Sequence, residues 1–336
     1  MRSFLVALVF LLAVYFLIGQ MAEAQQIAET LRRGDWRWLV AAFLLQLVWT
    51  TNVAASLRAI YRALGIEEKI ERLFPLAAAA FFVNIVAPVG GMSGVAVFIA
   101  EAKRRGQPIG RVSTAAALLV LYDYAAFLLV LILGLTILFR RGQLTGAEIS
   151  ASAILFLLAV GMGFLLYLGT RSGGQLGRAL AWMAGAINGL LRPFIRRDYL
   201  SIDQAHDFGH DAAEGLREAR RSPGTLIFPV ALALSSKALL ISILFFVFMA
   251  FRQPFSIGTL IAGFSIAYLF LIISPTPSGI GFVEGILTLT LTGLGVPLAA
   301  AALIALAYRG ITLWLPVAYG LVAFRMVSRA EPSRSA

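Results

Sequence analysis

Residues 274–281 read Ser-Pro-Thr-Pro-Ser-Gly-Ile-Gly and interrupt an apolar region that runs from Ser256 to Leu294. Residues 88–94 read Pro-Val-Gly-Gly-Met-Ser-Gly and interrupt a second apolar region, Leu73–Ala100. Proline removes a backbone donor and glycine holds the helical backbone poorly, so neither run suits a regular helix. Each region is therefore expected to contain a break between two helical segments.

The composition is typical of an integral membrane protein. Of the 336 residues, 60% are hydrophobic and 13% are charged, with a mean hydropathy of +0.87, whereas an average soluble domain is about 25% charged. The absence of cysteine excludes disulfides and thiolate metal sites. The net charge of +11 comes from basic residues beside apolar segments, which indicates contact with anionic lipid headgroups and not with nucleic acid.

Six apolar segments are near or above the length that a membrane-spanning helix needs, since about 20 residues cover roughly 30 Å of hydrocarbon. They are Ser3–Gly19, Trp38–Leu57, Ser113–Phe139, Ile149–Gly169, Thr225–Phe251 and Pro297–Phe324. The first segment also fits a cleavable signal peptide ending near Ala24. We expect a retained span, and either alternative leaves Gln25 on the outer side.

The loop charges indicate how the two broken regions lie. Basic residues flank Leu73–Ala100 on both sides, so a crossing there would leave one cluster outside, against the positive-inside rule. The clusters are Arg58, Arg62, Lys69 and Arg72 before the region, and Lys103, Arg104, Arg105 and Arg111 after it. The sequence therefore predicts an all-α polytopic membrane protein with six spanning helices and two re-entrant helical hairpins. Its N- and C-termini are expected to be cytoplasmic, in the bacterial plasma membrane.

An internal repeat relates the two broken regions. An offset of 189 residues superposes four Pro/Gly pairs: Pro88 on Pro277, Gly90 on Gly279, Gly106 on Gly295 and Pro108 on Pro297. The two units, 32–139 and 221–325, begin on opposite sides of the membrane, so the repeat is inverted, as in many secondary transporters. Between them lies a cytoplasmic linker, 171–221, with an amphipathic helix expected over Leu176–Leu191. The whole chain, 1–336, is expected to form one transmembrane domain.

Four ionisable residues lie inside apolar stretches, namely Asp123, Lys237, Glu284 and Arg309. At a bilayer centre each charge costs at least about 2.5 kcal/mol, so each side chain should face protein or water. Two acids and two bases also invite pairing. In one interpretation they form a buried set of ion pairs that only fixes helix packing. In the other, Lys237 and Arg309 receive a headgroup phosphate, and the two acids balance charge or carry a proton.

The two Pro/Gly loops supply further candidates for substrate contact. Such loops either let helices pack closely or expose backbone N–H groups that hold an anion, and their pairing by the repeat favours binding. The candidates are Asn84, Pro88, Gly90, Gly91, Pro277, Gly279 and Gly281. Asn84 is equally suited to satisfying the broken helix. His206 and His210 have the spacing of a metal pair, but their polar setting favours a solvated helix, so no metal or cofactor is expected.

Residues 275–284 read Pro-Thr-Pro-Ser-Gly-Ile-Gly-Phe-Val-Glu and are followed by Gly-Val-Pro at 295–297 and Tyr-Arg at 308–309. With these motifs nearly the whole chain resembles the lysylphosphatidylglycerol synthase/flippase transmembrane family. The resemblance implies a lipid-flipping membrane domain with two re-entrant elements. It also implies that five of the candidates are motif positions, namely Pro277, Gly279, Gly281, Glu284 and Arg309.

The chain departs from that family in two respects. Val95 and Ala96 follow Gly94, where the family resemblance leads us to expect an acid. Bifunctional members continue into an aminoacyl-transferase domain, and this chain stops at Ala336. Lysyl transfer is therefore not expected of this polypeptide alone.

Together these features predict a lipid flippase that moves a polar, phosphate-bearing headgroup through a midplane cavity between the hairpins. The expected partners are membrane lipids with an anionic or phosphate-bearing headgroup, and the expected protein is not an enzyme. Two alternatives stay open. One is a non-catalytic membrane partner of a separate lipid synthase. The other is a membrane transferase that acts on a lipid phosphate, with Glu284 or Asp123 as general base.

Overall fold

The structure, a computed structural model, describes residues 29–86, 93–191, 212–213, 216, 227–274 and 276–329. Across these ranges every regular element is a helix and no strand occurs. Five helices are long and apolar enough to span a membrane: Trp36–Ala63 (α2), Ile109–Arg140 (α5), Gly146–Arg171 (α6), Ile227–Ala250 (α9) and Leu298–Arg329 (α12 to α13). They coincide with five of the six expected spans. The remaining one, Ser3–Gly19, lies outside the described residues.

Four shorter helices occupy the two broken regions. They are Ile70–Val86 (α3), Ser93–Arg104 (α4), Ile257–Ile272 (α10) and Phe282–Gly293 (α11). The 12 residues of α4 and of α11 extend only about 18 Å, less than the thickness of the hydrocarbon. Within each region the two helices pack against each other, α3 on α4 and α10 on α11. The expected break in the second region is therefore present, and the short 3₁₀ turn Pro277–Gly279 (η2) lies in it. The break expected in the first region falls on residues 87–92, which lie outside the described residues.

The bounds of the helices repeat along the chain. Adding 189 to the bounds of α4 gives those of α11, and adding 189 to the bounds of α5 gives those of the span α12 to α13. The turns before the two long helices also agree, since Gly106 has a φ of 64° and Gly295 a φ of 93°. Only glycine adopts this left-handed backbone without strain. The sequence offset thus relates segments of equal length and similar turn geometry.

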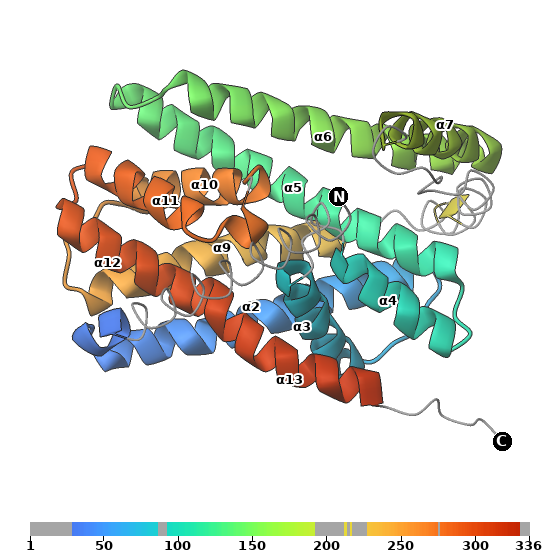
Figure 1. The fold of residues 1–336 in the computed structure, drawn as a ribbon, viewed down its shortest axis with the longest axis horizontal. Helices are drawn as coiled ribbons and strands as arrows, with labels where there is room; N and C mark the ends of the chain where they lie inside the picture. Colours follow the sequence, from blue (N-terminus) through green and yellow to red (C-terminus); the bar gives the residue numbers. More distant parts are fainter. Residues whose placement is uncertain are drawn as a thin grey trace, which may run out of the picture.

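The helix connections gather at two ends of the molecule (Figure 1). The loops 64–69 and 105–108 lie at the right of the view with the C-terminal end of α13, and we call this the basic end. The loops that follow α5, α9 and α11 lie at the left, which we call the opposite end. Helix α3 begins and α4 finishes at the basic end, whereas α10 begins and α11 finishes at the opposite end.

Three helix pairs join the two halves of the chain most extensively. Helix α2 lies along α9, α3 lies against α13, and α5 lies against α10. Glycines permit the closest approaches: a Cβ added to Gly320 of α13 would lie 2.7 Å from the carbonyl oxygen of Ala78 in α3. A Cβ at Gly134 of α5 would overlap the side chain of Ser265 in α10. Small residues allow this proximity between membrane helices, where packing drives association.

The outer surface of α6 is apolar and exposed. Leu157 is 67% exposed, and Phe156 and Phe164 are exposed to a similar degree. Such a surface is stable only against hydrocarbon, which agrees with a multi-pass membrane protein. After α6 comes Gly173–Leu191 (α7), which matches the helix expected over Leu176–Leu191 and exposes Trp182. His206 and His210 lie outside the described residues.

The last span contains a local change of helical register. Residues Gly310–Trp314 (η3) form a π-helical turn between Leu298–Arg309 (α12) and Leu315–Arg329 (α13). The N–H of Leu315 donates to the carbonyl oxygen of Gly310, five residues earlier. Pro316 follows directly, and its missing N–H and bulky ring disfavour the regular i to i−4 pattern. The π turn begins directly after Arg309 and accommodates the proline at position 316.

Substitution of Gly320 by alanine should loosen the contact between α13 and α3. The new methyl group would meet the backbone oxygen of Ala78, which cannot rotate away. We therefore expect the free energy of unfolding to fall by ~1–3 kcal/mol. Gly161→Ala on α6 is the matched control because a Cβ there has no neighbour within 4 Å. The apparent melting temperature in detergent, followed by size-exclusion fluorescence, should fall for Gly320→Ala only. Equal melting temperatures for both variants would contradict the packing.

Candidate functional site

The break between α10 and α11 is built on backbone that favours glycine. Ser278, Gly279 and Gly281 have φ values of 53°, 72° and 75°. At Gly279 an added Cβ would also overlap the side chain of Val283, so both conformation and space require glycine. Gly281 is the N-cap residue of α11. The chain thereby places Glu284 in the first turn of α11, where the helix dipole favours a carboxylate.

Glu284 and Arg309 form a buried ion pair. The Nε atom of Arg309 lies 2.6 Å from Oε1 of Glu284, and the two side chains are 4% and 8% exposed, respectively. Nη2 of Arg309 donates to the carbonyl oxygen of Ser278 at 2.7 Å. Arg309 thus connects the end of α12 to the start of α11 and to the loop before it. Oε2 of Glu284 is buried and accepts no hydrogen bond from the described residues.

A second charged cluster joins three helices. Nζ of Lys237 in α9 lies 2.5 Å from Oδ1 of Asp123 in α5, and it donates to the hydroxyl of Tyr268 in α10 at 2.8 Å. The Tyr268 hydroxyl in turn donates to Oδ2 of Asp123 at 2.8 Å. The ammonium also lies 4.0 Å from the centroid of the Tyr268 ring. The Lys237 side chain is only 1% exposed, whereas that of Asp123 is 30% exposed.

Both clusters lie well inside their spans. Asp123 is the fifteenth of the 32 residues of α5, and Lys237 is the eleventh of the 24 residues of α9. Arg309 is the twelfth of the 32 residues from Leu298 to Arg329. At 1.5 Å per residue each charge is therefore more than 10 Å from either end of its span, a depth at which ionisable groups need partners.

The pairing expected of the four ionisable residues is confirmed, with Asp123 bound to Lys237 and Glu284 bound to Arg309. Both bases are thus already neutralised by a carboxylate. A phosphate that approached Lys237 or Arg309 would have to bind beside the carboxylate or replace it. The geometry is compatible with both interpretations, helix packing and headgroup contact.

The first loop is described only at its borders. Asn84, near the end of α3, accepts a hydrogen bond from the N–H of Gly94 through Oδ1 at 2.6 Å. Asn84 therefore satisfies a donor at the start of α4, one of its two expected roles. Pro88, Gly90 and Gly91 lie outside the described residues. The second loop reaches the first broken region, since η2 contacts α3.

Sequence reasoning missed several polar contacts within the spans. Tyr268 lies within an apolar run, so the sequence gives no sign of a polar role, yet its hydroxyl binds both Asp123 and Lys237. The other contacts are carried by α2: Trp49 Nε1 donates to Ser236 at 2.8 Å, Asn52 Nδ2 donates to the Leu232 carbonyl at 2.8 Å, and Thr50 pairs with Tyr319 at 2.5 Å. The available signal was the recurrence of polar residues at three- and four-residue intervals along α2.

The buried charges of Glu284 and Arg309 have no counterparts at the corresponding positions of the first unit. Subtracting 189 from Glu284 and Arg309 leads to Val95 and Val120. The repeated helix lengths therefore coexist with different chemistry. In the described part of the chain, no three His, Asp or Glu side chains gather closely enough to hold a metal ion.

Comparison with known proteins agrees with this architecture. Residues 3–320 match the family described as the lysylphosphatidylglycerol synthase TM region. The chain belongs to this family. It is also 23% identical over 325 residues to a UPF0104 membrane protein of Methanothermobacter thermautotrophicus, covering 93% of this chain and 94% of that relative. The family resemblance expected from the motif around Glu284 is confirmed.

Removing one partner of the Asp123 cluster should have unequal effects. Asp123→Asn leaves the almost fully buried Lys237 without a carboxylate, a change that costs about 3–5 kcal/mol for buried pairs. Lys237→Met leaves a partly exposed Asp123 that keeps its bond from Tyr268, so it should destabilise less. Apparent melting temperatures should rank Lys237→Met above Asp123→Asn, with the double variant above Asp123→Asn as well. The reverse order would show that Lys237 is not the buried member that needs its partner.

Proposed function

We propose that this protein is a lipid flippase, which moves a polar, phosphate-bearing headgroup between the two leaflets. The observation that carries the proposal is the position of two charge pairs deep within the spans, beside a break in the helices. Ionisable groups at this depth are expensive and commonly mark a transport pathway. Membership of a family named for lysylphosphatidylglycerol synthase supports a lipid-related role.

We propose further that the broken regions are re-entrant hairpins of an inverted repeat. Helices α4 and α11 are too short to span, and their bounds differ by the same 189 residues as those of the long helices that follow. The first broken region begins and finishes at the basic end, and the second begins and finishes at the opposite end (Figure 1). Inverted repeats with discontinuous helices that meet near the midplane are the architecture of many secondary transporters. The contact of η2 with α3 supports such a meeting.

In the proposed mechanism the headgroup passes between the two loops and contacts Arg309. The guanidinium is planar and binds phosphate through two hydrogen bonds, so a phosphate can compete with Glu284 for it. Lys237 acts in the same way against Asp123. The carboxylates keep both sites neutral when no headgroup is present, which avoids an unpaired buried charge. Rocking of one unit against the other alternates access between the leaflets.

The distribution of basic residues supports an orientation with the basic end in the cytoplasm of a plasma-membrane protein. The basic end carries Arg58, Arg62, Lys69, Arg72, Lys103, Arg104, Arg105, Arg111, Arg325 and Arg329. The opposite end carries Arg32, Arg33, Arg37, Arg140, Arg141 and Arg252. Both chain termini would then be cytoplasmic if the first 28 residues contain one span.

The flippase proposal is favoured over a transferase by the state of the carboxylates. A general base needs a free carboxylate within reach of its substrate. Glu284 is 6% exposed, with Oε1 bound by Arg309 and Oε2 buried away from solvent, and both oxygens of Asp123 are bound, by Lys237 and Tyr268. These contacts suit electrostatic balance more than proton abstraction. Translocation in proteoliposomes distinguishes a flippase from a non-catalytic partner of a lipid synthase, because only a flippase moves lipid on its own.

Translocation of a fluorescent phospholipid in proteoliposomes should depend on Glu284 and Arg309. We expect Glu284→Gln and Arg309→Ala to lower the translocation rate at least about tenfold. Each substitution removes one charge of the buried ion pair and leaves its partner uncompensated in the proposed pathway. Glu148→Gln is the matched control: Glu148 is half-buried at the start of α6, far along the chain from Glu284 and Arg309, and forms a capping box, a position that glutamine also fills. Its rate should equal that of the unaltered protein.

Size-exclusion profiles and melting temperatures identify variants that fail to fold. Wild-type rates in folded Glu284→Gln and Arg309→Ala would refute the assignment of these residues to the pathway. No translocation by the unaltered protein, with full activity of a lipid synthase only in its presence, would favour the partner role.

A further inference from the structure

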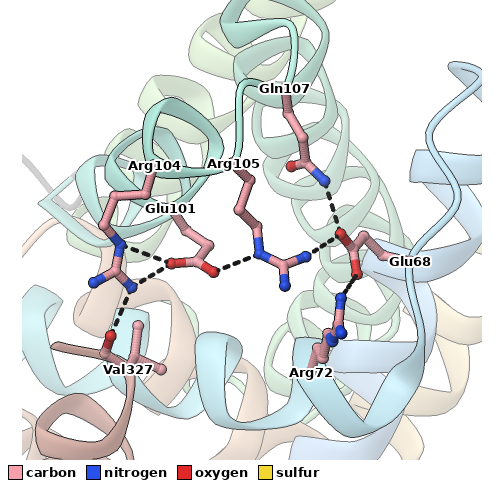
Figure 2. Close-up of polar contacts among 7 residues, drawn as sticks. All are labelled: Glu68, Arg72, Glu101, Arg104, Arg105, Gln107 and Val327. Carbon is pink, nitrogen blue, oxygen red and sulfur yellow. Dashed lines mark hydrogen bonds and ion pairs between the residues drawn. The ribbon is translucent and has the colours of Figure 1, made fainter. Parts of the chain in front are cut away.

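A chain of ion pairs crosses the basic end of the molecule (Figure 2). Glu101 lies 2.5 Å from Nη2 of Arg104 and 2.9 Å from Nε of Arg105. Glu68 lies 2.8 Å from Arg105 and 3.9 Å from Arg72. Two carboxylates, both largely covered, therefore serve three arginines.

Two further contacts extend this network. The side-chain amide of Gln107 donates to Glu68 at 2.7 Å, and Arg104 donates to the carbonyl oxygen of Val327 in α13 at 2.6 Å. The network thus joins the loops around α3 and α4 to the end of the last span. Oε1 of Glu68 accepts from both Arg105 and Gln107, and Oε2 lies near Arg72, so each oxygen of this carboxylate has a partner within the network.

A pocket of about 350 Å³ lies beside this network, and three of its four basic side chains form no ion pair with Glu68 or Glu101. Its lining consists of Arg58, Arg62, Glu67, Glu68, Lys69 and Arg72, four basic and two acidic residues. Within the described ranges, Arg58, Arg62 and Lys69 form no ion pair with a carboxylate. Nε of Arg58 is buried and donates no hydrogen bond to the described residues. A buried guanidinium donor without an acceptor is costly, and an anion bound beside Arg58 would offset that cost.

A second pocket of about 250 Å³ adjoins the first and shares Glu68 and Arg72 with it. This pocket lies where α3, α4 and α13 meet, and its lining is mixed. One side consists of the charged residues of the network together with Glu71, and the other consists of the apolar residues Leu73, Leu76, Phe98, Met326 and Val327. Glu68 and Arg72 therefore border both pockets, and the second pocket adds an apolar side next to the cationic lining of the first. This combination matches an amphiphile with an anionic headgroup.

We propose that the basic end binds one anionic phospholipid of the adjacent leaflet. Its phosphate occupies the cationic pocket against Arg58, Arg62 and Lys69, and its apolar part lies along the second pocket. Basic hollows between helices at a membrane surface recognise anionic headgroups in this way. Guanidinium groups supply paired hydrogen bonds to phosphate oxygens. The site is separate from the charge pairs at Asp123 and Glu284, and its occupation does not depend on lipid translocation.

Binding of dioctanoyl phosphatidylglycerol to the purified protein in neutral detergent tests this proposal. Isothermal titration calorimetry should detect binding to the unaltered protein that weakens about tenfold in Arg58→Gln/Arg62→Gln. The matched control is Arg32→Gln/Arg33→Gln, which removes the same charge from exposed positions at the opposite end. Its affinity should be unchanged. If the first variant does not fold, Lys69→Gln provides a milder test at an exposed position.

The probes separate the sources of the phosphate. Inorganic phosphate and glycerophosphoglycerol, which lacks acyl chains, should bind far more weakly than the lipid because they make no contact with the apolar side of the second pocket. Equal affinity for the lipid and for inorganic phosphate would overturn the assignment to a phospholipid. Equal weakening in both double-arginine variants would overturn the pocket, since it would mean nonspecific attraction to net positive charge. Neither result bears on translocation, which proteoliposomes measure separately.

Discussion

A guanidinium inside hydrocarbon must find its hydrogen-bond acceptors within the protein, and Arg309 finds them on a segment that could not otherwise stay at that depth. The loop before α11 has backbone groups that no helix satisfies. One of them, the Ser278 carbonyl, accepts from Arg309, which also binds Glu284. Irregular backbone in a membrane is tolerated only where it is buried in protein or faces water. The ion pair and the helix break therefore stabilise each other.

The same requirement explains how the two halves are held together. Asp123, Lys237 and Tyr268 come from three different helices, two of them in the second half of the chain. Without a large hydrophobic driving force between helices, membrane proteins rely on close packing and interhelical hydrogen bonds. Gly320 provides the first at α3, and the contacts of Trp49 and Asn52 with α9 provide the second. Packing and polar contacts thus alternate along the interface between the halves.

Much of this architecture could be predicted from the sequence, because span length and helix breakers are local properties. The five described spans and the break between α10 and α11 follow from apolar runs and from Pro/Gly content alone. The choice of partners does not, since Lys237 lies 114 residues from Asp123 in the chain and pairs with it only after α5 and α9 pack together. Tyr268 was hidden by its apolar neighbours. The π turn before Pro316 was also missed, because a proline predicts a disturbance but not its form.

Helices of matching length at a fixed offset, one set carrying Glu284 and Arg309 and the other carrying Val95 and Val120, have a consequence for the energy landscape of the protein. Identical halves would make any two conformations that exchange the roles of the halves isoenergetic. Here the positions that correspond to the charged pair are both valine. Two conformations that exchange the roles of the halves would therefore not be equal in energy, although the helix lengths match. If the halves exchange roles as the proposed inverted repeat implies, the two conformations would differ in free energy before any ligand or membrane potential acts.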